Sequence, residues 1–363
     1  MNILVVPDTG RSYNSVRPEA EIYISLAKLG HKIIVMTDLT SAYIDEYKKA
    51  NIELIDLKPG KKISWAAIKT IRQVIKANNI DIVYATKSRT IPNATFACIG
   101  TNAQMVAYRG TTGGLYKTDI SNYLSILHPR INGVICVAKS VEKHVKSKVS
   151  KNKHKNVTTI YKGHDFSWYQ EEAIDLSSVQ SSKDYFNILC VGSPRSHKGT
   201  DSVLKAMTYL SDLSDLRLIL VGNGLDQEPF NSLIESSPAK PLIIRTGFRN
   251  DVPQLAKAVD FTLLPSTRKE GLPRTILESL ASGTPVITSD IDGAVEIVSD
   301  QVNGLVFSAG NETELAKTIR LAYADEALRK RLTDNAKDVI TTTFSHQQTV
   351  QNYQQYFQQL LHH

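Results

Sequence analysis

The chain has 363 residues, of which 42% are hydrophobic and 22% are charged, and its formal net charge is +7. Such a length suits two domains of about 170 residues each, and the composition is ordinary for a globular protein rather than a disordered one. No apolar run approaches the ~20 residues of a membrane-spanning helix, and three scattered cysteines are too few for a disulfide framework.

The first half alternates between continuous apolar runs and helical patterns. Strands are predicted at 2–7, 31–37, 52–57, 81–86, 105–110 and 133–138, and helices at 18–30, 41–51 and 65–79. Strands that are apolar throughout, each followed by a helix, indicate a parallel sheet covered on both faces.

A basic segment follows these strands. Between Lys139 and Lys155 there are seven lysines and one acid, Glu142. Valines at 137, 141, 145 and 149 form a narrow apolar stripe among the lysines. One interpretation is a surface helix that packs its valines on a sheet; the other is a basic patch that attracts anionic lipid head groups or an acidic acceptor. The two interpretations are compatible.

The composition then changes, and the strand–helix pattern begins again. Residues 170–184 are acidic and rich in serine, which predicts a linker or an exposed loop. Further strands are predicted at 187–193, 216–222, 242–248, 260–266 and 285–290, and a last helix at 346–363 with Val350, Tyr353, Phe357 and Leu360 on one face. The chain therefore reads as two open α/β domains, in which ligands bind outside the carboxyl ends of the strands.

Two glutamates lie in the most informative stretch, Pro265–Pro285. Glu270 falls in a loop after an apolar strand, and Glu278 lies on the helix that follows. Pro273 suits the first helical position, so the next amides are expected at a positive helix end. This arrangement can hold an anion on amides, with one acid binding hydroxyls on either side of it. A nucleotide-sugar is such a ligand.

This stretch resembles the signature of the retaining nucleotide-sugar glycosyltransferases of family 4. The resemblance implies the GT-B fold: two Rossmann-like domains with a deep interdomain cleft and a C-terminal helix that crosses back to the first domain. The expected parts are an acceptor-side domain at 1–170, a donor domain at 171–345 and the returning helix at 346–363. In the family the first glutamate, here Glu270, contacts the donor sugar, and the second, here Glu278, binds the ribose.

The same resemblance implies further donor contacts. The amide segment comprises Gly271, Leu272, Pro273, Arg274 and Thr275. The DGAVEIV block that follows also matches, although Gly293-Ala294 stands where the family usually has two glycines.

Cations are expected beside the leaving diphosphate, because neutralising its negative charge is the main electrostatic requirement of glycosyl transfer from a nucleotide. Lys198-Gly199 matches the family's Lys-Gly at a helix start, but Ser193 holds the usual arginine position and Arg195 is the arginine present. Lys198 and Arg195 are therefore the phosphate candidates; the alternative for Lys198 is an exposed loop cation.

Other loops carry weaker matches. The Gly222-Asn223 turn allows close approach of backbone to ligand, or it only reverses the chain. Phe248 and Arg249 are candidates for bordering the nucleobase. In the first domain, Gly10 stands alone where the family has paired glycines near the phosphates.

Two more family positions differ in this chain. Arg109-Gly110 replaces the usual His-Gly, so that Arg109 is expected near the reacting sugar, unless it is an ordinary member of a surface ion pair. Lys162 replaces the asparagine of the joint between the domains, whereas Gly163 and Asp165 are retained.

By this resemblance the chain is expected to be a metal-independent retaining glycosyltransferase without a cofactor. It would move a sugar from a UDP- or GDP-linked donor to a glycan or glycolipid acceptor in cell-surface polysaccharide or lipopolysaccharide synthesis. A cytoplasmic location is expected, the inner membrane face being left open, with no nucleic-acid partner. The alternatives are a GT-B-like nucleotide-sugar epimerase and a non-enzymatic protein that binds anionic surfaces.

Overall fold

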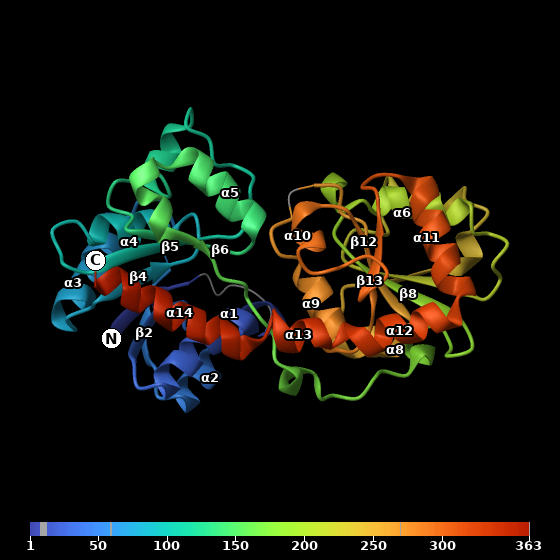
Figure 1. Cartoon of the computed structure of the whole chain (residues 1–363), viewed down its shortest axis with the longest axis horizontal. Helices are drawn as coiled ribbons and strands as arrows, with labels where there is room; N and C mark the ends of the chain where they lie inside the picture. The colour runs from blue at the N-terminus through green and yellow to red at the C-terminus, as the bar shows by residue number, and fades with distance from the viewer. Residues whose placement is uncertain (8–12, 59, 269, 363) are drawn as a thin grey trace. The chain divides into compact units, whose positions relative to one another are not determined.

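The computed structural model describes residues 1–7, 13–58, 60–268 and 270–362, which group into two compact units (Figure 1). Unit 1 comprises Met1–Gly163 and His346–His363, and unit 2 comprises His164–Ser345. The division lies earlier in the chain than the expected boundary after residue 170. The last helix groups with the first unit.

Unit 1 is built on a seven-stranded sheet in the order β3-β2-β1-β4-β5-β6-β7, in which all neighbours are parallel. Its strands are β1 (Asn2–Val6), β2 (Lys32–Thr37), β3 (Glu53–Asp56), β4 (Ile82–Ala85), β5 (Gln104–Arg109), β6 (Gly133–Cys136) and β7 (Val157–Thr159). Its helices are α1 (Tyr13–Lys28), α2 (Ile44–Lys49), α3 (Trp65–Ala77), α4 (Thr90–Ala97), α5 (Lys139–Lys148) and α14 (His346–Leu361). The apolar runs of β1, β2, β4, β5 and β6 are largely buried in the sheet, as predicted, whereas the edge strand β3 is only partly buried.

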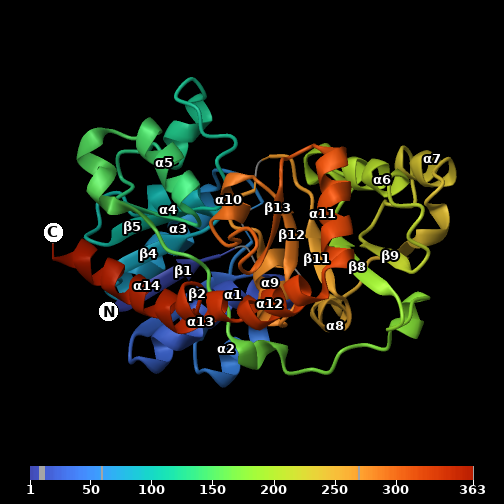
Figure 2. The same cartoon turned by 45° about the vertical axis from the view of Figure 1, so that its right-hand side comes forward.

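The last helix completes the core of unit 1. Helix α14 lies along α1 in both views (Figures 1 and 2). Val350, Tyr353, Phe357 and Leu360, the face predicted from the sequence, are all buried. The Tyr353 hydroxyl lies 2.9 Å from that of Tyr84 on β4, so that the buried phenols satisfy each other.

Unit 2 contains a six-stranded parallel sheet in the order β10-β9-β8-β11-β12-β13. Its strands are β8 (Phe186–Val191), β9 (Leu216–Val221), β10 (Ile243–Gly247), β11 (Phe261–Leu264), β12 (Val286–Ser289) and β13 (Gly304–Phe307). Its helices are α6 (Thr200–Thr208), α7 (Phe230–Glu235), α8 (Val252–Ala258), α9 (Arg274–Ala281), α10 (Asp292–Val295), α11 (Glu312–Ala324), α12 (Glu326–Ala336) and α13 (Asp338–Thr342). Both units are thus Rossmann-like, as expected.

The segment expected as a linker is only partly exposed. Within 170–184 a short 3₁₀ helix, Leu176–Val179, buries Leu176 and Val179 against Leu255 and Val259 at the α8 side of unit 2. Two apolar residues among polar ones were too sparse to produce a periodic pattern. The prediction of a linker was therefore wrong for this part.

The basic segment divides into a helix and a turn. Helix α5 buries Val141 and Val145 on the sheet, whereas Val149 lies beyond the helix end. The Nζ of Lys153 donates to the carbonyl oxygens of His128, Pro129 and Ile131 at 3.2, 2.9 and 3.0 Å. Burial lowers the pKa of Lys153. This lysine therefore acts as an internal clamp rather than as part of a solvated face.

Candidate active site in the second unit

The order of the strands decides where the site residues of unit 2 meet. Strands β8 and β11 are parallel neighbours, and from them the chain proceeds outward in opposite directions, through β9 and β10 on one side and β12 and β13 on the other. Ligands of open α/β sheets bind at the carboxyl ends of such a pair. Lys198 follows β8 and Glu270 follows β11.

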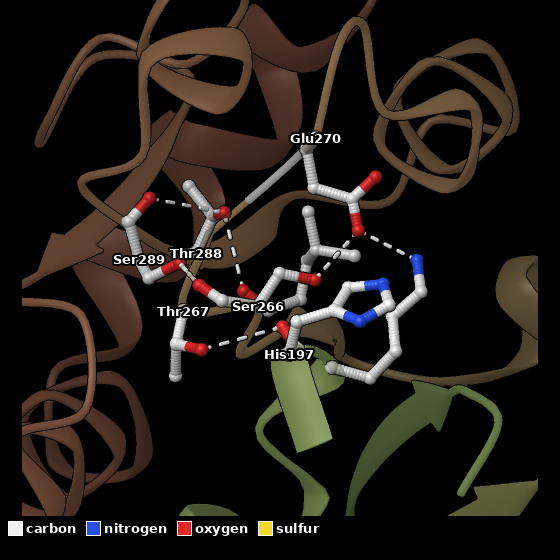
Figure 3. Close-up of polar contacts among 8 residues, drawn as sticks. His197, Ser266, Thr267, Glu270, Thr288 and Ser289 are labelled. Carbon is white, nitrogen blue, oxygen red and sulfur yellow. Dashed lines mark hydrogen bonds and ion pairs between the residues drawn. The ribbon is translucent and has the colours of Figure 1, made fainter. Parts of the chain in front are cut away.

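These two side chains form an ion pair. The Nζ of Lys198 lies 2.6 Å from Oε1 of Glu270, and the side chains are 27% and 15% exposed. The backbone N–H of Thr267 donates to the carbonyl oxygen of His197 at 2.9 Å, and the Thr267 hydroxyl lies 3.5 Å from the same oxygen (Figure 3), so that the two loops are tied together. The sequence predicted both charged residues as site members, but not that they contact each other across 72 positions.

Ser266 also holds Glu270. Its hydroxyl donates to the same oxygen, Oε1, at 2.8 Å, so that Oε2 takes part in neither bond (Figure 3). Ser266 is fully buried, and its carbonyl oxygen accepts a hydrogen bond from the hydroxyl of Ser289 at the end of β12. Ser266 was not among the predicted site residues. The signal was a small polar residue at the end of the predicted apolar strand 260–266.

Two glycines allow the loops to approach one another. Gly199 has a left-handed φ of +70°, and a Cβ there would lie 2.0 Å from the carbonyl oxygen of Pro265. A Cβ at Gly293 would lie 1.7 Å from the carbonyl oxygen of Gly271. Side chains at these positions would displace the segments that carry Lys198 and Glu270.

Helix α9 begins one residue later than predicted. Pro273 has an extended ψ of 110° and precedes the helix, so it is not the first helical residue. The backbone N–H of Ile276 donates to the carbonyl oxygen of Pro273 at 3.2 Å, so it is already paired within the protein. Arg274 and Thr275 remain at the positive helix end.

Glu278 is a buried carboxylate on this helix. Its side chain is 9% exposed and lies 2.9 Å from Nε of Arg274, one turn earlier. Burial raises the pKa of Glu278, and the charge and hydrogen bond of Arg274 oppose that rise. In this structure Arg274, predicted as a donor-binding residue, contacts this acid.

The other candidates of unit 2 lie on loops at strand ends. Arg195 is exposed in the loop after β8. Asn223 is exposed after β9, and a Cβ at Gly222 would lie 1.9 Å from the carbonyl oxygen of Gly192, so this glycine serves an approach between two loops of the protein. Phe248 is 61% exposed, and Arg249 pairs with Asp251 through Nε and Oδ1 at 2.8 Å.

The candidates of unit 1 fare differently. Gly10 lies outside the described residues. Arg109 ends β5, and its guanidinium donates to the carbonyl oxygens of Thr111 (2.8 Å) and Gly113. Burial lowers the pKa of Arg109. The side chain thus fixes its own loop, and it is not an ordinary surface ion pair.

The described part of the chain has neither a candidate metal site nor a helix suited to span a membrane. No group of three or more histidines, cysteines and acids there is placed to hold a metal ion. No helix there combines the length and apolarity needed to cross a bilayer. Cys98, Cys136 and Cys190 are free and buried.

Comparison with known proteins agrees with this architecture. Residues 172–339 match the model of "Glycosyl transferases group 1", and residues 20–168 match the model of "Glycosyltransferase Family 4". Together the two matches leave out only the ends of the chain and residues 169–171. The chain belongs to the family 4-type glycosyltransferases with the GT-B fold.

Curated relatives extend the match to particular proteins. An uncharacterized glycosyltransferase of Methanocaldococcus jannaschii is 28% identical over 65% of this chain and 63% of its own length. The N,N'-diacetylbacillosaminyl-diphospho-undecaprenol alpha-1,3-N-acetylgalactosaminyltransferase of Campylobacter jejuni is 34% identical over 41% of this chain and 38% of its own. The chain thus spans less than two thirds of these relatives.

Solved structures share the fold over almost the whole chain. A glycosyltransferase of Rickettsia africae has a TM-score of 0.84 at 21% identity, covering 99% of this chain and 98% of its own. HepE of Anabaena in complex with UDP has a TM-score of 0.83 at 19% identity, covering 99% of this chain and 100% of its own. HepE has also been solved with UDP-glucose.

Proposed function

We propose that the chain is a retaining glycosyltransferase that moves a sugar from a nucleotide-sugar to a glycan or glycolipid acceptor. The observation that carries this proposal is the Lys198–Glu270 pair at the ends of β8 and β11, next to the start of α9. It lies in the unit that matches the group 1 glycosyltransferases. HepE has been solved with UDP and with UDP-glucose. These ligands carry the diphosphate and the sugar hydroxyls that a cation and an acid at such a site could bind.

The chemistry assigns one task to each group. When the bond between the anomeric carbon and the phosphate oxygen breaks, negative charge develops on the diphosphate. Lys198, Arg195 and the first amides of α9 stabilise that charge, so that no metal ion or other cofactor is required. A diphosphate oxygen takes the proton of the acceptor hydroxyl, which attacks from the face that the nucleotide leaves.

The two acids hold the ends of the donor. Glu270 accepts hydrogen bonds from sugar hydroxyls through Oε2, the oxygen that Lys198 and Ser266 do not use. Glu278 accepts from the ribose hydroxyls of a uridine or guanosine diphosphate. Phe248 and Arg249 border the base, and Gly222 and Asn223 form the turn beside it. In the first unit, Arg109 is the proposed contact of the reacting sugar and Gly10 the proposed contact of the phosphates.

The acceptor belongs, in this proposal, to cell-surface polysaccharide or lipopolysaccharide synthesis at the inner face of the cell membrane. The Campylobacter relative is named for a diphospho-undecaprenol-linked substrate. The exposed lysines of the 139–155 segment supply positive charge that an anionic bilayer attracts. The cytoplasm is the proposed location, and nucleic acid is not a proposed partner.

A thermal-shift screen of nucleoside diphosphates and their sugars tests this function. One of them should stabilise the protein, by about 2.7 kcal/mol at 100 times its dissociation constant. Nuclear magnetic resonance of the product should then show the anomeric configuration of the donor. If no nucleoside diphosphate stabilises the protein, or if Glu270→Ala turns over as fast as the unchanged protein, the proposal fails.

A further inference from the structure

The loop between β5 and β6 exposes three large apolar side chains. Tyr116, Ile120 and Tyr123 are 56%, 81% and 45% exposed. Scattered single apolar residues on a surface need no explanation, but three within eight positions of one loop form a patch. The loop rises above α5 in both views (Figures 1 and 2).

The loop is built to hold these side chains outward. The side-chain amide of the buried Asn122 donates to the carbonyl oxygen of Tyr116 at 3.1 Å, and the backbone carbonyl oxygen of Asn122 accepts from the backbone N–H of Leu127 at 2.9 Å. Oδ1 of Asp119 accepts from the amide of Ser121 at 2.9 Å and starts a 3₁₀ turn at Ile120. A hydrogen-bonded turn therefore presents Ile120 at its tip.

Both ends of the loop are fixed to the basic segment. Leu115 is fully buried and its backbone hydrogen-bonds to His144 on α5. At the other end, Lys153 clamps the carbonyl oxygens of residues 128, 129 and 131. The apolar loop and the lysine-rich helix are thus one fixed surface, in which Lys117, Lys139 and Lys143 are exposed.

We propose that Tyr116, Ile120 and Tyr123, with Lys117, Lys139 and Lys143, form a docking surface that inserts its apolar tip into an anionic phospholipid bilayer. The occupant follows from chemistry. Lysines are attracted to a negative leaflet, whereas tyrosine rings occupy the boundary between head groups and acyl chains and isoleucine enters the acyl region. This deepens the lipid-linked acceptor of the proposed function and rests on it.

Binding to vesicles of phosphatidylglycerol and phosphatidylcholine in equal parts tests the surface, at about 0.15 M salt where unspecific long-range attraction is screened. Ile120→Ser should weaken binding about tenfold because one buried aliphatic side chain is lost. Lys143→Gln should weaken it about fivefold. Matched controls lie in unit 2: Tyr209→Ser, with a tyrosine that is also 56% exposed, and Lys317→Gln, with an exposed lysine; neither should change binding.

Each other outcome overturns the inference. If Lys143→Gln weakens binding but Ile120→Ser does not, the contact is only electrostatic. If Ile120→Ser leaves vesicle binding unchanged and converts a dimer to a monomer in sedimentation, the patch joins two copies of the chain. Nucleotide stabilisation measured on the same variants separates the two proposals. Vesicle binding without nucleotide binding refutes the proposed function, and nucleotide binding without vesicle binding refutes the docking surface.

Discussion

Glu278, the proposed ribose-binding acid, is a buried carboxylate that costs the fold stability. Burial raises its pKa above the usual 4.5 although Arg274 is adjacent. A group whose pKa is raised on folding favours the folded state fully below the unfolded pKa, and this contribution is lost as pH rises through the folded pKa. The raised pKa of Glu278 therefore makes the fold less stable toward neutral pH than in acid. Such a cost is expected of a residue that is selected for ligand binding rather than for stability.

We expect Glu278→Gln to unfold at a temperature at least as high as that of the unchanged protein at neutral pH. The amide keeps the shape of the side chain but has no charge to bury. Affinity for the nucleoside diphosphate should fall tenfold or more, because a charged acceptor of ribose hydroxyls contributes about 1.5–3 kcal/mol. Calorimetric unfolding between pH 4.5 and 8, with nucleotide titration, checks this. A destabilised variant with unchanged affinity would contradict it.

Ser266 is a positioning residue for Glu270. In Ser266→Ala the acid keeps Lys198 but loses the second bond to Oε1. A hydrogen bond to a charged group contributes about 1.5 kcal/mol or more, so kcat should fall about tenfold with little change in nucleotide affinity. Ser279→Ala is the matched control, since this buried serine bonds Thr262 and Thr284 and not Glu270. Equal kcat in both variants would remove the positioning role.

Sequence patterns singled out candidate site residues but not the residues that these contact. Lys198, Glu270 and Glu278 lie in motifs that a single chain shows. The Lys198–Glu270 and Arg274–Glu278 pairs depend on side-chain direction and on which strands are neighbours. Ser266 was missed because a serine after a strand is common in loops and only the fold buries it.

At the scale of elements, the predictions succeeded where apolar runs were long. Every strand of five or six residues was found. Helix α4 was missed for two reasons. Pro92 and Asn93 interrupt its short apolar pattern, and the helix is buried on nearly all sides, so that it has no apolar stripe opposite a polar face. Strand β7 was missed because its three residues are too few for a periodic signal. Strand β13 was also missed, although its four residues equal the length of β3 and β4, which were predicted.

A partly buried ion pair connects helix α1 to the segment that follows β7. Lys162 pairs with Glu19, and these side chains are only 16% and 18% exposed. Lys162 also lies 3.9 Å from the ring centre of Tyr108. Burial would raise the pKa of Glu19, but the charge and hydrogen bond of Lys162 and the hydrogen bond of Tyr23 together lower it. The lysine that replaces the family's asparagine therefore acts within unit 1.

We expect Lys162→Met to destabilise unit 1 by about 3–5 kcal/mol, because the buried charge of Glu19 loses its cation and keeps only the hydrogen bond from Tyr23. The double change Glu19→Leu with Lys162→Met should recover most of this loss. In the unchanged protein the lowered pKa of Glu19 supplies stability above 4.5 that is lost as pH falls through the folded pKa. In the single variant, acid should instead be less harmful. Denaturant unfolding followed by hydrogen exchange of α1 peptides measures both effects; an additive double variant would contradict the pairing.

At the scale of the whole molecule, unit 1 is completed by residues from the far end of the chain. The last helix returns to unit 1, where the hydroxyl of Thr349 accepts from the amide of Gly163 at 2.9 Å and donates to the carbonyl oxygen of Tyr161 at 2.8 Å. The two crossings between the units therefore lie side by side, at Gly163–His164 and Ser345–His346. Unit 2, in contrast, is continuous in sequence and holds all the predicted nucleotide contacts except Arg109 and Gly10.

This division predicts where a nucleotide stabilises the protein. A ligand that binds only folded unit 2 raises the free energy of its opening by RT ln(1 + [L]/Kd), about 2.7 kcal/mol at 100 times Kd. Amide exchange in β8, β11 and α9 should slow about a hundredfold, while exchange in β1, β4 and α14 stays within about threefold. Mass spectrometry of exchanged peptides with saturating nucleoside diphosphate resolves the two sets. Equal slowing in both units would mean that they open together, and slowing in unit 1 alone would place the nucleotide in the wrong unit.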